Sequence, residues 1–138
     1  MNVGDIMSRD ALTVNENETV AVVAKRMQEQ KHGFVVVIDK DMPLRVIGVL
    51  SDTDIIGKVV AANRTPDSVH VKEIMTVGII SAKEDQQVTE AAQIMRTYHV
   101  KRLPVLKDGK LAGVISSTDI MHSMIDVKKL LSDIIVKL

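Results

Sequence analysis

Two short segments of this chain present hydroxyl and carboxylate side chains in the same order. Residues 48–55 read GVLSDTDI and residues 113–120 read GVISSTDI, with six of eight positions identical. We call this shared pattern the GVxSxTDI motif. In each copy a Thr follows the Ser by two positions and an Asp follows it by three. The hydroxyls can donate hydrogen bonds to a phosphate, and the carboxylate can accept from both hydroxyls of a ribose.

Each motif is predicted to end a strand and begin a helix. A Ser at the N-cap with an acid three residues later forms a capping box, which stabilises a helix by about 1 kcal/mol and needs no ligand. The Gly of each motif can likewise mark only a strand bend or a close backbone approach. The same helix start also offers unpaired N–H groups to a phosphate. The side chains open to both interpretations are Ser51, Thr53, Asp54, Ser116, Thr118 and Asp119.

A phosphate bound beside an Asp needs cations nearby. At about 6 Å and an effective dielectric constant near 20, the repulsion is roughly 3 kcal/mol. A helix N-terminus returns only about 0.3–1 kcal/mol. Lys101 and Arg102, just before Pro104, can supply the positive charge, and His99 can assist. The structural alternative for this pair is a solvated strand start.

The elements that must position these groups occur twice. Helical periodicity covers residues 19–30, with Asn17 or Thr19 as the cap, and recurs from residue 88. Apolar strands are predicted at 35–38 and 46–50 and again at 103–106 and 111–115, the second pair joined by the hairpin signal Asp108-Gly109. Short strands near 12–14 and 79–81 precede the helices, and second helices are predicted at about 54–62 and about 119–137. Each repeat is therefore β-α-β-β-α.

The repeats define the predicted organisation of the chain. The first repeat spans residues 1–62, a polar linker 63–69, the second repeat 70–125 and a C-terminal helical extension 126–138. A unit of about sixty residues is marginal alone. We therefore expect an α/β (α+β) fold in which two sheets pack face to face in a pseudo-twofold relation.

The paired motifs, in register, resemble a tandem pair of CBS (cystathionine-β-synthase) domains, the Bateman module. The resemblance rests on Asp5-Ile6-Met7-Ser8 and Glu73-Ile74-Met75-Thr76, on residues 100–105 (VKRLPV), and on both GVxSxTDI motifs. It covers about residues 3–125 and implies a stand-alone regulatory module.

The resemblance implies two ligand clefts, each built from both repeats. Backbone groups of the strand segments would pair with the adenine edge, hydroxyls and cations would bind phosphate, and Asp would bind ribose. The first cleft would combine Ser51, Thr53 and Asp54 with Ser81, Val100, Lys101, Arg102 and Pro104. The second would combine Ser116, Thr118 and Asp119 with Thr13, Gly33, Phe34, Val35 and Val36.

The two predicted clefts differ in charge. The first contains Lys101 and Arg102, whereas the second has Phe34, Val35 and Val36 at the matching positions. We expect the Asp54 cleft to bind AMP, ADP or ATP better. S-adenosylmethionine or NAD is the alternative ligand, and a scaffold protein whose motifs are only helix caps is the alternative function.

Composition excludes several other classes. Lys+Arg and Asp+Glu are both 18 among 138 residues, with one Phe, one Tyr and no Trp, so we expect no nucleic-acid partner. There is no Cys, no metal-ligand spacing among the four His, and no nucleophile beside a base. We therefore predict no enzyme activity, no metal and no required cofactor. No membrane-spanning segment or signal peptide is recognised, which favours the cytoplasm.

The predicted helices carry more apolar residues than one small core can cover. Val22 and Ile94 lie beyond a single stripe, and the last helix continues with Leu131, Ile134 and Ile135. A wide core face would explain this, but we favour a symmetric homodimer. The extension 126–138 is interpreted as a contact for the dimer or for an unidentified protein partner.

Overall fold

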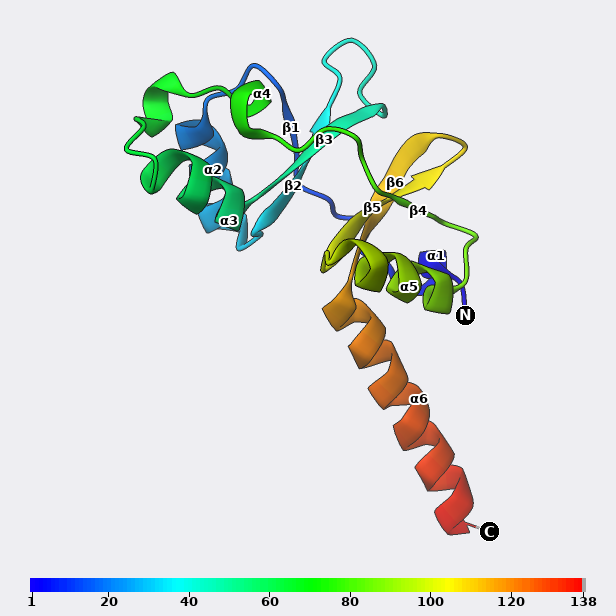
Figure 1. The fold of residues 1–138 in the computed structure, drawn as a ribbon. Helices are drawn as coiled ribbons and strands as arrows, with labels where there is room; N and C mark the ends of the chain where they lie inside the picture. Colours follow the sequence, from blue (N-terminus) through cyan, green and yellow to red (C-terminus); the bar gives the residue numbers. More distant parts are fainter. Residues whose placement is uncertain (138) are drawn as a thin grey trace. The chain divides into compact units, whose positions relative to one another are not determined.

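The computed structural model describes residues 1–137 and contains two three-stranded sheets with flanking helices (Figure 1). The mixed α+β class predicted from the repeat is confirmed. Leu138, the last residue of the predicted extension, lies outside the described residues. The elements in chain order are α1 (Val3–Ile6), β1 (Thr13–Asn15), α2 (Val20–Gln30), β2 (Phe34–Ile38), β3 (Val46–Ser51), α3 (Asp52–Ile55), η1 (Ile56–Val60), η2 (Pro66–Ser68), α4 (Val71–Ile74), β4 (Ala82–Lys83), α5 (Val88–Tyr98), β5 (Arg102–Lys107), β6 (Lys110–Ser116) and α6 (Ser117–Lys137).

The chain divides into two compact units, and neither consists of one repeat alone. Unit 1 contains Met1–Arg9, Ile80–Lys107 and Ala112–Leu138, and unit 2 contains Asp10–Ile79 and Asp108–Leu111. The opening segment of the first repeat, with α1, therefore belongs to the unit that holds most of the second repeat. The predicted boundaries follow the sequence repeat. In the compact units, by contrast, the opening segment of each repeat belongs to the unit that holds most of the other repeat.

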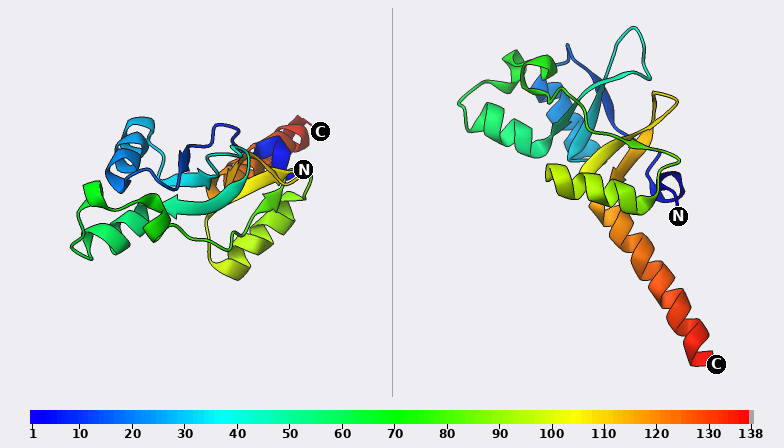
Figure 2. Two further views of the ribbon diagram at one scale, coloured as in Figure 1. Left: turned by 90° about the horizontal axis from the view of Figure 1, so that it is seen from above. Right: turned by 45° about the vertical axis from the view of Figure 1, so that its right-hand side comes forward.

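Unit 2 packs α2 and the α3–η1 segment against one sheet (Figure 2). In that sheet β1 is parallel to β2, and β2 is antiparallel to β3. Val20, Val23 and Met27 of α2 are buried at the spacing predicted for one helical face, and they join a core with Val35 of β2 and Leu50 of β3. The helix predicted at 19–30 is thus confirmed.

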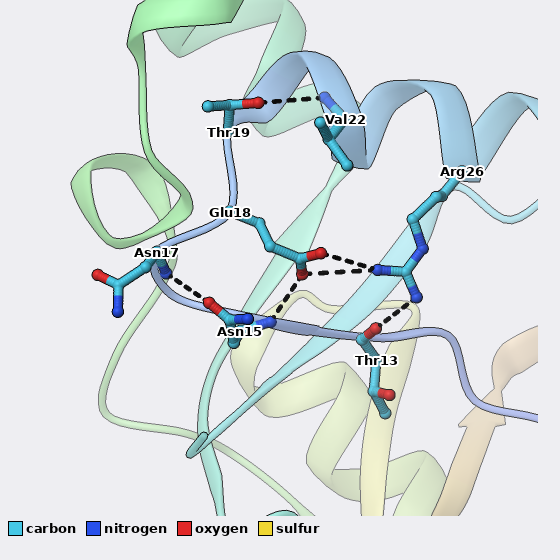
Figure 3. A network of polar contacts seen from close by, with 7 residues as sticks. All are labelled: Thr13, Asn15, Asn17, Glu18, Thr19, Val22 and Arg26. Carbon is cyan, nitrogen blue, oxygen red and sulfur yellow. Dashed lines mark hydrogen bonds and ion pairs between the residues drawn. The ribbon is translucent and has the colours of Figure 1, made fainter. Parts of the chain in front are cut away.

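A polar network joins the start of α2 to β1 (Figure 3). The Thr19 hydroxyl caps α2 by accepting from the Val22 N–H at 3.4 Å. The Glu18 carboxylate accepts from the Asn15 N–H at 2.9 Å and from the Arg26 guanidinium at 3.2 Å. Because that guanidinium also donates to the Thr13 carbonyl oxygen at 2.9 Å, one side chain links the helix to both ends of the strand.

Unit 1 repeats this arrangement with β4, β5 and β6 in that order and with α5 and α6. The predicted turn between β5 and β6 is confirmed, since Asp108 and Gly109 have φ of 52° and 76°. These turn residues belong to unit 2, where the Leu111 N–H donates to the Leu44 carbonyl oxygen at 2.8 Å. In the part of the chain that is described, no helix is long and apolar enough to cross a membrane.

The glycines of the two GVxSxTDI motifs mark close backbone approaches. Val114 and Ser8 exchange N–H···O bonds of 2.9 Å, and a Cβ on Gly113 would overlap the Ser8 carbonyl oxygen. Val49 and Thr76 form the same pair, and a Cβ on Gly48 would lie 2.8 Å from the Met75 sulfur. Each motif glycine therefore seats the opening segment of the other repeat against a strand.

The opening segment of unit 1 is also held by an ion pair. Arg9 lies 2.8 Å from one carboxylate oxygen of Glu84, and Lys107 lies 3.6 Å from the other. The hydrogen bond from Arg9 lowers the pKa of Glu84, and the charge of Lys107 adds to this effect. The Gly4 N–H donates to the Glu84 carbonyl oxygen at 2.9 Å, so α1 and β4 are joined by backbone and side chain.

Some predicted boundaries were wrong. The second helices begin at Asp52 and Ser117 instead of residues 54 and 119, because the motif serines are already the caps. The predicted 54–62 helix is the α-turn α3 followed by the π-helical η1. The short helices α1 and α4 were not predicted, since four residues carry too little periodicity. The predicted linker contains the 3₁₀ turn η2 and ends in Val69, which is buried.

We predict opposite effects for alanine at two glycines. Gly113→Ala should lower the free energy of unfolding by about 1–3 kcal/mol, because the new methyl group meets backbone that cannot rotate away. Gly57→Ala, where a Cβ meets nothing within 4 Å, should raise it by up to roughly 1 kcal/mol. Urea unfolding followed by circular dichroism measures both. Equal stability of the two variants would contradict the close approach.

Candidate functional site

Ser51 and Asp54 form a reciprocal cap at the start of α3. The Ser51 N–H donates to Asp54 Oδ2 at 2.9 Å, and the Asp54 N–H donates to Ser51 Oγ at 3.2 Å. Ser51 Oγ also lies 2.8 Å from the Thr53 hydroxyl and 3.1 Å from Asp54 Oδ2. The structural interpretation of the motif as a capping box is therefore confirmed in the first repeat.

Ser116 and Asp119 form the same cap at the start of α6. The Ser116 N–H donates to Asp119 Oδ2 at 2.9 Å, and the Asp119 N–H donates to Ser116 Oγ at 3.0 Å. Both aspartates are half-buried, whereas Thr53 and Thr118 are exposed. The two motifs thus form the same reciprocal cap, so the repetition of the motif has a structural cause in both units.

Lys58 distinguishes the first motif from the second. Its Nζ lies 3.4 Å from Asp54 Oδ1 and donates to the Ile74 carbonyl oxygen at 2.9 Å. The charge of Asp54 is therefore paired with that of Lys58 within its own unit, and Lys58 also connects Asp54 to the end of α4. The position that matches Lys58 in the second repeat is Ser123, whose hydroxyl donates to the Ile120 carbonyl oxygen at 2.7 Å. The sequence contains a signal for this contact, because an acidic residue and a lysine four positions apart in a helix can form an ion pair. The sequence analysis did not identify it.

One backbone hydrogen bond in each unit connects the helix start to the start of the central strand. The Asp52 N–H donates to the Gly33 carbonyl oxygen at 2.8 Å, and the Ser117 N–H donates to the Lys101 carbonyl oxygen at 2.8 Å. Each motif consequently lies beside the strand start of its own repeat. Only in the second repeat does this strand start carry cations: Lys101 and Arg102 are both exposed.

The sheet register leaves the starts of the central strands beyond the parallel pairing. β1 pairs from Thr13 opposite Val36 onward, so Phe34 and Val35 lie outside its register. β4 pairs from Ala82 opposite Val105 onward, so residues 102–104 lie outside it, and Ser81 immediately precedes the pairing. These segments are the places where backbone groups could meet a ligand edge, as the sequence predicts for the adenine base.

Burial limits what some candidate residues can offer. The side chains of Val35, Val36 and Pro104 are buried, and Val100 is half-buried. The Val36 N–H already donates to the Leu12 carbonyl oxygen at 2.9 Å. The buried side chains of Val36 and Pro104 therefore offer no polar contact to a ligand, and direct polar contacts fall to the exposed groups around them.

Residues of the predicted clefts come from both units. Within unit 2 the structure brings Gly33 and Phe34 together with Ser51 and its cap, and Thr13 lies one strand away. Within unit 1 it brings Lys101 together with Ser117. The pairing of Asp54 with Lys101, and of Asp119 with Gly33, joins residues of different units and stays a prediction.

A separate hollow of about 380 Å³ lies beside the first motif, in unit 2. Its polar lining includes Lys31, His32 and Asp52, and its apolar lining includes Met27 and Ile55. Ser51, Thr53 and Asp54 are not among its lining residues. Across residues 1–137, no cluster of three or more His, Asp or Glu side chains is arranged to hold a metal ion.

Comparison with known proteins agrees with the architecture. A model of the CBS domain matches residues 3–61 and 71–126. An uncharacterized protein of Methanopyrus kandleri is 36% identical over 124 residues, which cover 88% of this chain and 62% of that protein. The chain thus spans less than two thirds of that relative.

Solved structures give the same result. An uncharacterized conserved protein from Pyrococcus horikoshii superposes with a TM-score of 0.82 at 25% identity, covering 89% of this chain and 91% of its own. The CBS domain pair of protein MJ0100, in complex with 5′-methylthioadenosine and S-adenosyl-L-methionine, superposes with a TM-score of 0.79 at 27% identity, covering 90% and 99%. Two matched repeats, two motif-capped helices and these similarities lead to one conclusion: the chain belongs to the CBS domain family, as a tandem pair.

Proposed function

We propose that this protein is a non-enzymatic regulatory module of the cytoplasm that binds an adenine nucleotide (AMP, ADP or ATP). Occupancy would be passed to a partner protein through the packing of the module. The observation that carries this proposal is the 2.8 Å hydrogen bond from the Ser117 N–H to the Lys101 carbonyl oxygen. It places the start of a long helix beside the backbone of Lys101, and the side chains of Lys101 and Arg102 are exposed.

The charges around α6 suit an anionic ligand. A 21-residue helix carries a partial positive charge at its N-terminus, and exposed hydroxyls of Ser and Thr add donors. The negative charge of Asp119 would repel a phosphate by roughly 3 kcal/mol at about 6 Å. Lys101 and Arg102 together offset that repulsion, so the group can accept a nucleotide phosphate.

Capping the helix leaves hydrogen-bond acceptor positions free on the carboxylate of the motif aspartate. A carboxylate offers about four lone-pair positions, and one backbone N–H occupies Oδ2 of Asp119. The remaining positions can accept from the two hydroxyls of a ribose. Asp54 is more heavily engaged, because Ser51 and Lys58 contact both of its oxygens. Unit 1 by itself therefore combines a less engaged aspartate with the cations, whereas the family resemblance assigns those cations to Asp54.

A second candidate is an adenosyl ligand without phosphate. The similarity to the MJ0100 pair, which holds 5′-methylthioadenosine and S-adenosyl-L-methionine, favours this alternative. Such a ligand shares the ribose and adenine but carries no phosphate, so its affinity should depend less on Lys101 and Arg102 than that of a nucleotide. The two candidates thus differ in how much they depend on these cations.

Calorimetric titration with ATP and AMP tests the nucleotide site. We expect saturable binding by the unmodified chain and at least a roughly tenfold weaker Kd in Lys101→Ala/Arg102→Ala, because two charge-assisted contacts are lost. The matched control is Lys128→Ala/Lys129→Ala, which removes equal charge from the exposed surface of α6. Absence of binding by the unmodified chain, or equal loss in both double variants, would contradict the proposal.

Asparagine at each motif aspartate separates the two assignments of the cations. If the site lies within unit 1, Asp119→Asn should abolish the dependence of nucleotide affinity on Lys101 and Arg102. If these cations belong to the Asp54 cleft, as the family resemblance implies, Asp54→Asn should abolish that dependence instead. A double-mutant cycle between each Asp→Asn change and the double alanine variant measures this coupling. If neither aspartate couples to the cations although circular dichroism shows both variants folded, the motifs are helix caps and the scaffold alternative holds.

Thermal-shift titrations with each ligand distinguish a nucleotide site from a site for a sulfonium ligand. With the Lys101→Ala/Arg102→Ala chain, a thermal-shift titration should show a larger loss of stabilisation by ATP than by S-adenosylmethionine if both can occupy the ribose site. Stabilisation of the unmodified chain by S-adenosylmethionine alone would replace the nucleotide assignment with the adenosyl one.

A further inference from the structure

The C-terminal part of α6 continues past the residues that match the CBS domain. The family match ends at residue 126, whereas α6 runs to Lys137. In Figures 1 and 2 this part of the helix extends beyond α5 of the same unit. The large apolar side chains exposed on it, with exposed fractions of 41–69%, are Val127, Leu130, Leu131, Ile134 and Ile135.

Four apolar residues of α6 follow the spacing of a coiled-coil seam. Met124, Val127, Leu131 and Ile134 are separated by three, four and three positions, as residues at heptad positions a and d are. Ile120 precedes Met124 by four positions and is buried in the core of unit 1. The seam therefore begins inside the unit and continues onto the exposed helix, where the four residues are 41–59% exposed.

The inner end of this seam borders a hollow. Met124, Val127 and Leu131 line a space of about 350 Å³ together with Met1 and with Val88 at the start of α5. A second helix laid along the seam would fill the hollow and cover the exposed apolar side chains. The hollow and the seam are thus one continuous apolar surface.

We propose that the seam of α6 pairs in parallel with the same seam of a second copy of this chain. A heptad seam is self-complementary, because equal residues meet at each level of a parallel pair. A twofold interface requires such self-complementarity. The homodimer expected from the sequence would then be held by the segment outside the matched family.

Charge selects the parallel orientation. In a parallel pair the positions flanking the seam place Ser123 opposite Lys128 and Leu130 opposite Ile135, so no like charges meet. An antiparallel pair that matches Met124 with Ile134 instead brings the two Lys128 side chains together. Like charges facing one another disfavour that alternative.

Sedimentation of the full chain over a range of concentrations tests the pairing. We expect a dimer for the unmodified chain, at least a roughly tenfold higher dimer Kd for Leu131→Glu because a charge enters the seam, and no change for His122→Glu on the opposite side of α6. A monomeric unmodified chain would overturn the proposal. So would a Leu131→Glu dimer as tight as the original, which would assign the pairing to another exposed apolar face such as Val22, Ile56 and Val60 of unit 2.

Disulfide trapping tests the orientation independently, because the chain contains no Cys. Under mild oxidation Ile134→Cys should form a disulfide-linked dimer with itself. A mixture of Met124→Cys and Ile134→Cys chains should give only the like-with-like products. A cross-linked heterodimer without the like-with-like products would establish the antiparallel pair and overturn the parallel one.

Discussion

The architecture depends on two glycines that let the opening segment of each repeat approach a strand of the other repeat closely. Gly113 and Gly48 leave room for backbone of the opening segments, where any Cβ would meet the Ser8 carbonyl or the Met75 side chain. The adjoining pairs, Val114 with Ser8 and Val49 with Thr76, then add one isolated antiparallel β-bridge to each unit. Because each opening segment comes from the other repeat, each compact unit needs residues of both, which gives a physical reason for the tandem arrangement.

The GVxSxTDI motif serves two structural purposes at once. Its glycine allows the close approach, and three residues later its serine ends the strand and caps a helix. Both requirements recur in both units, so the identity of the two copies does not by itself imply a ligand. The differences between the copies carry the functional information: Lys58 against Ser123 at the aspartate, and Gly33 against Lys101 at the strand start.

Local patterns were predictable from the sequence and long-range pairings were not. The α2 face and the turn at Asp108-Gly109 depend on residues close together in the chain, and they were predicted correctly; of the two caps considered for α2, Thr19 and Asn17, the structure has Thr19. The exchange of opening segments depends on contacts such as Ser8 with Val114, for which periodicity gives no signal. The motif serines were recognised as caps, yet the helices were bounded at about residues 54 and 119, two residues after their starts at Asp52 and Ser117. For the candidate site, the sequence proposes the motif groups and the two cations, whereas the Lys58 contact and the neighbours of each motif required coordinates.

The proposed second role of the capped helix starts is to bind an adenine nucleotide. The most direct measurement is an NMR titration of the ¹⁵N-labelled full chain with AMP, observing the backbone amides. If the helix starts bind the nucleotide, the amides of Lys101, Arg102 and residues 116–119 should shift saturably with one common Kd. Unchanged amides in these segments at millimolar AMP, or shifts confined to residues remote from both motifs, would contradict this role.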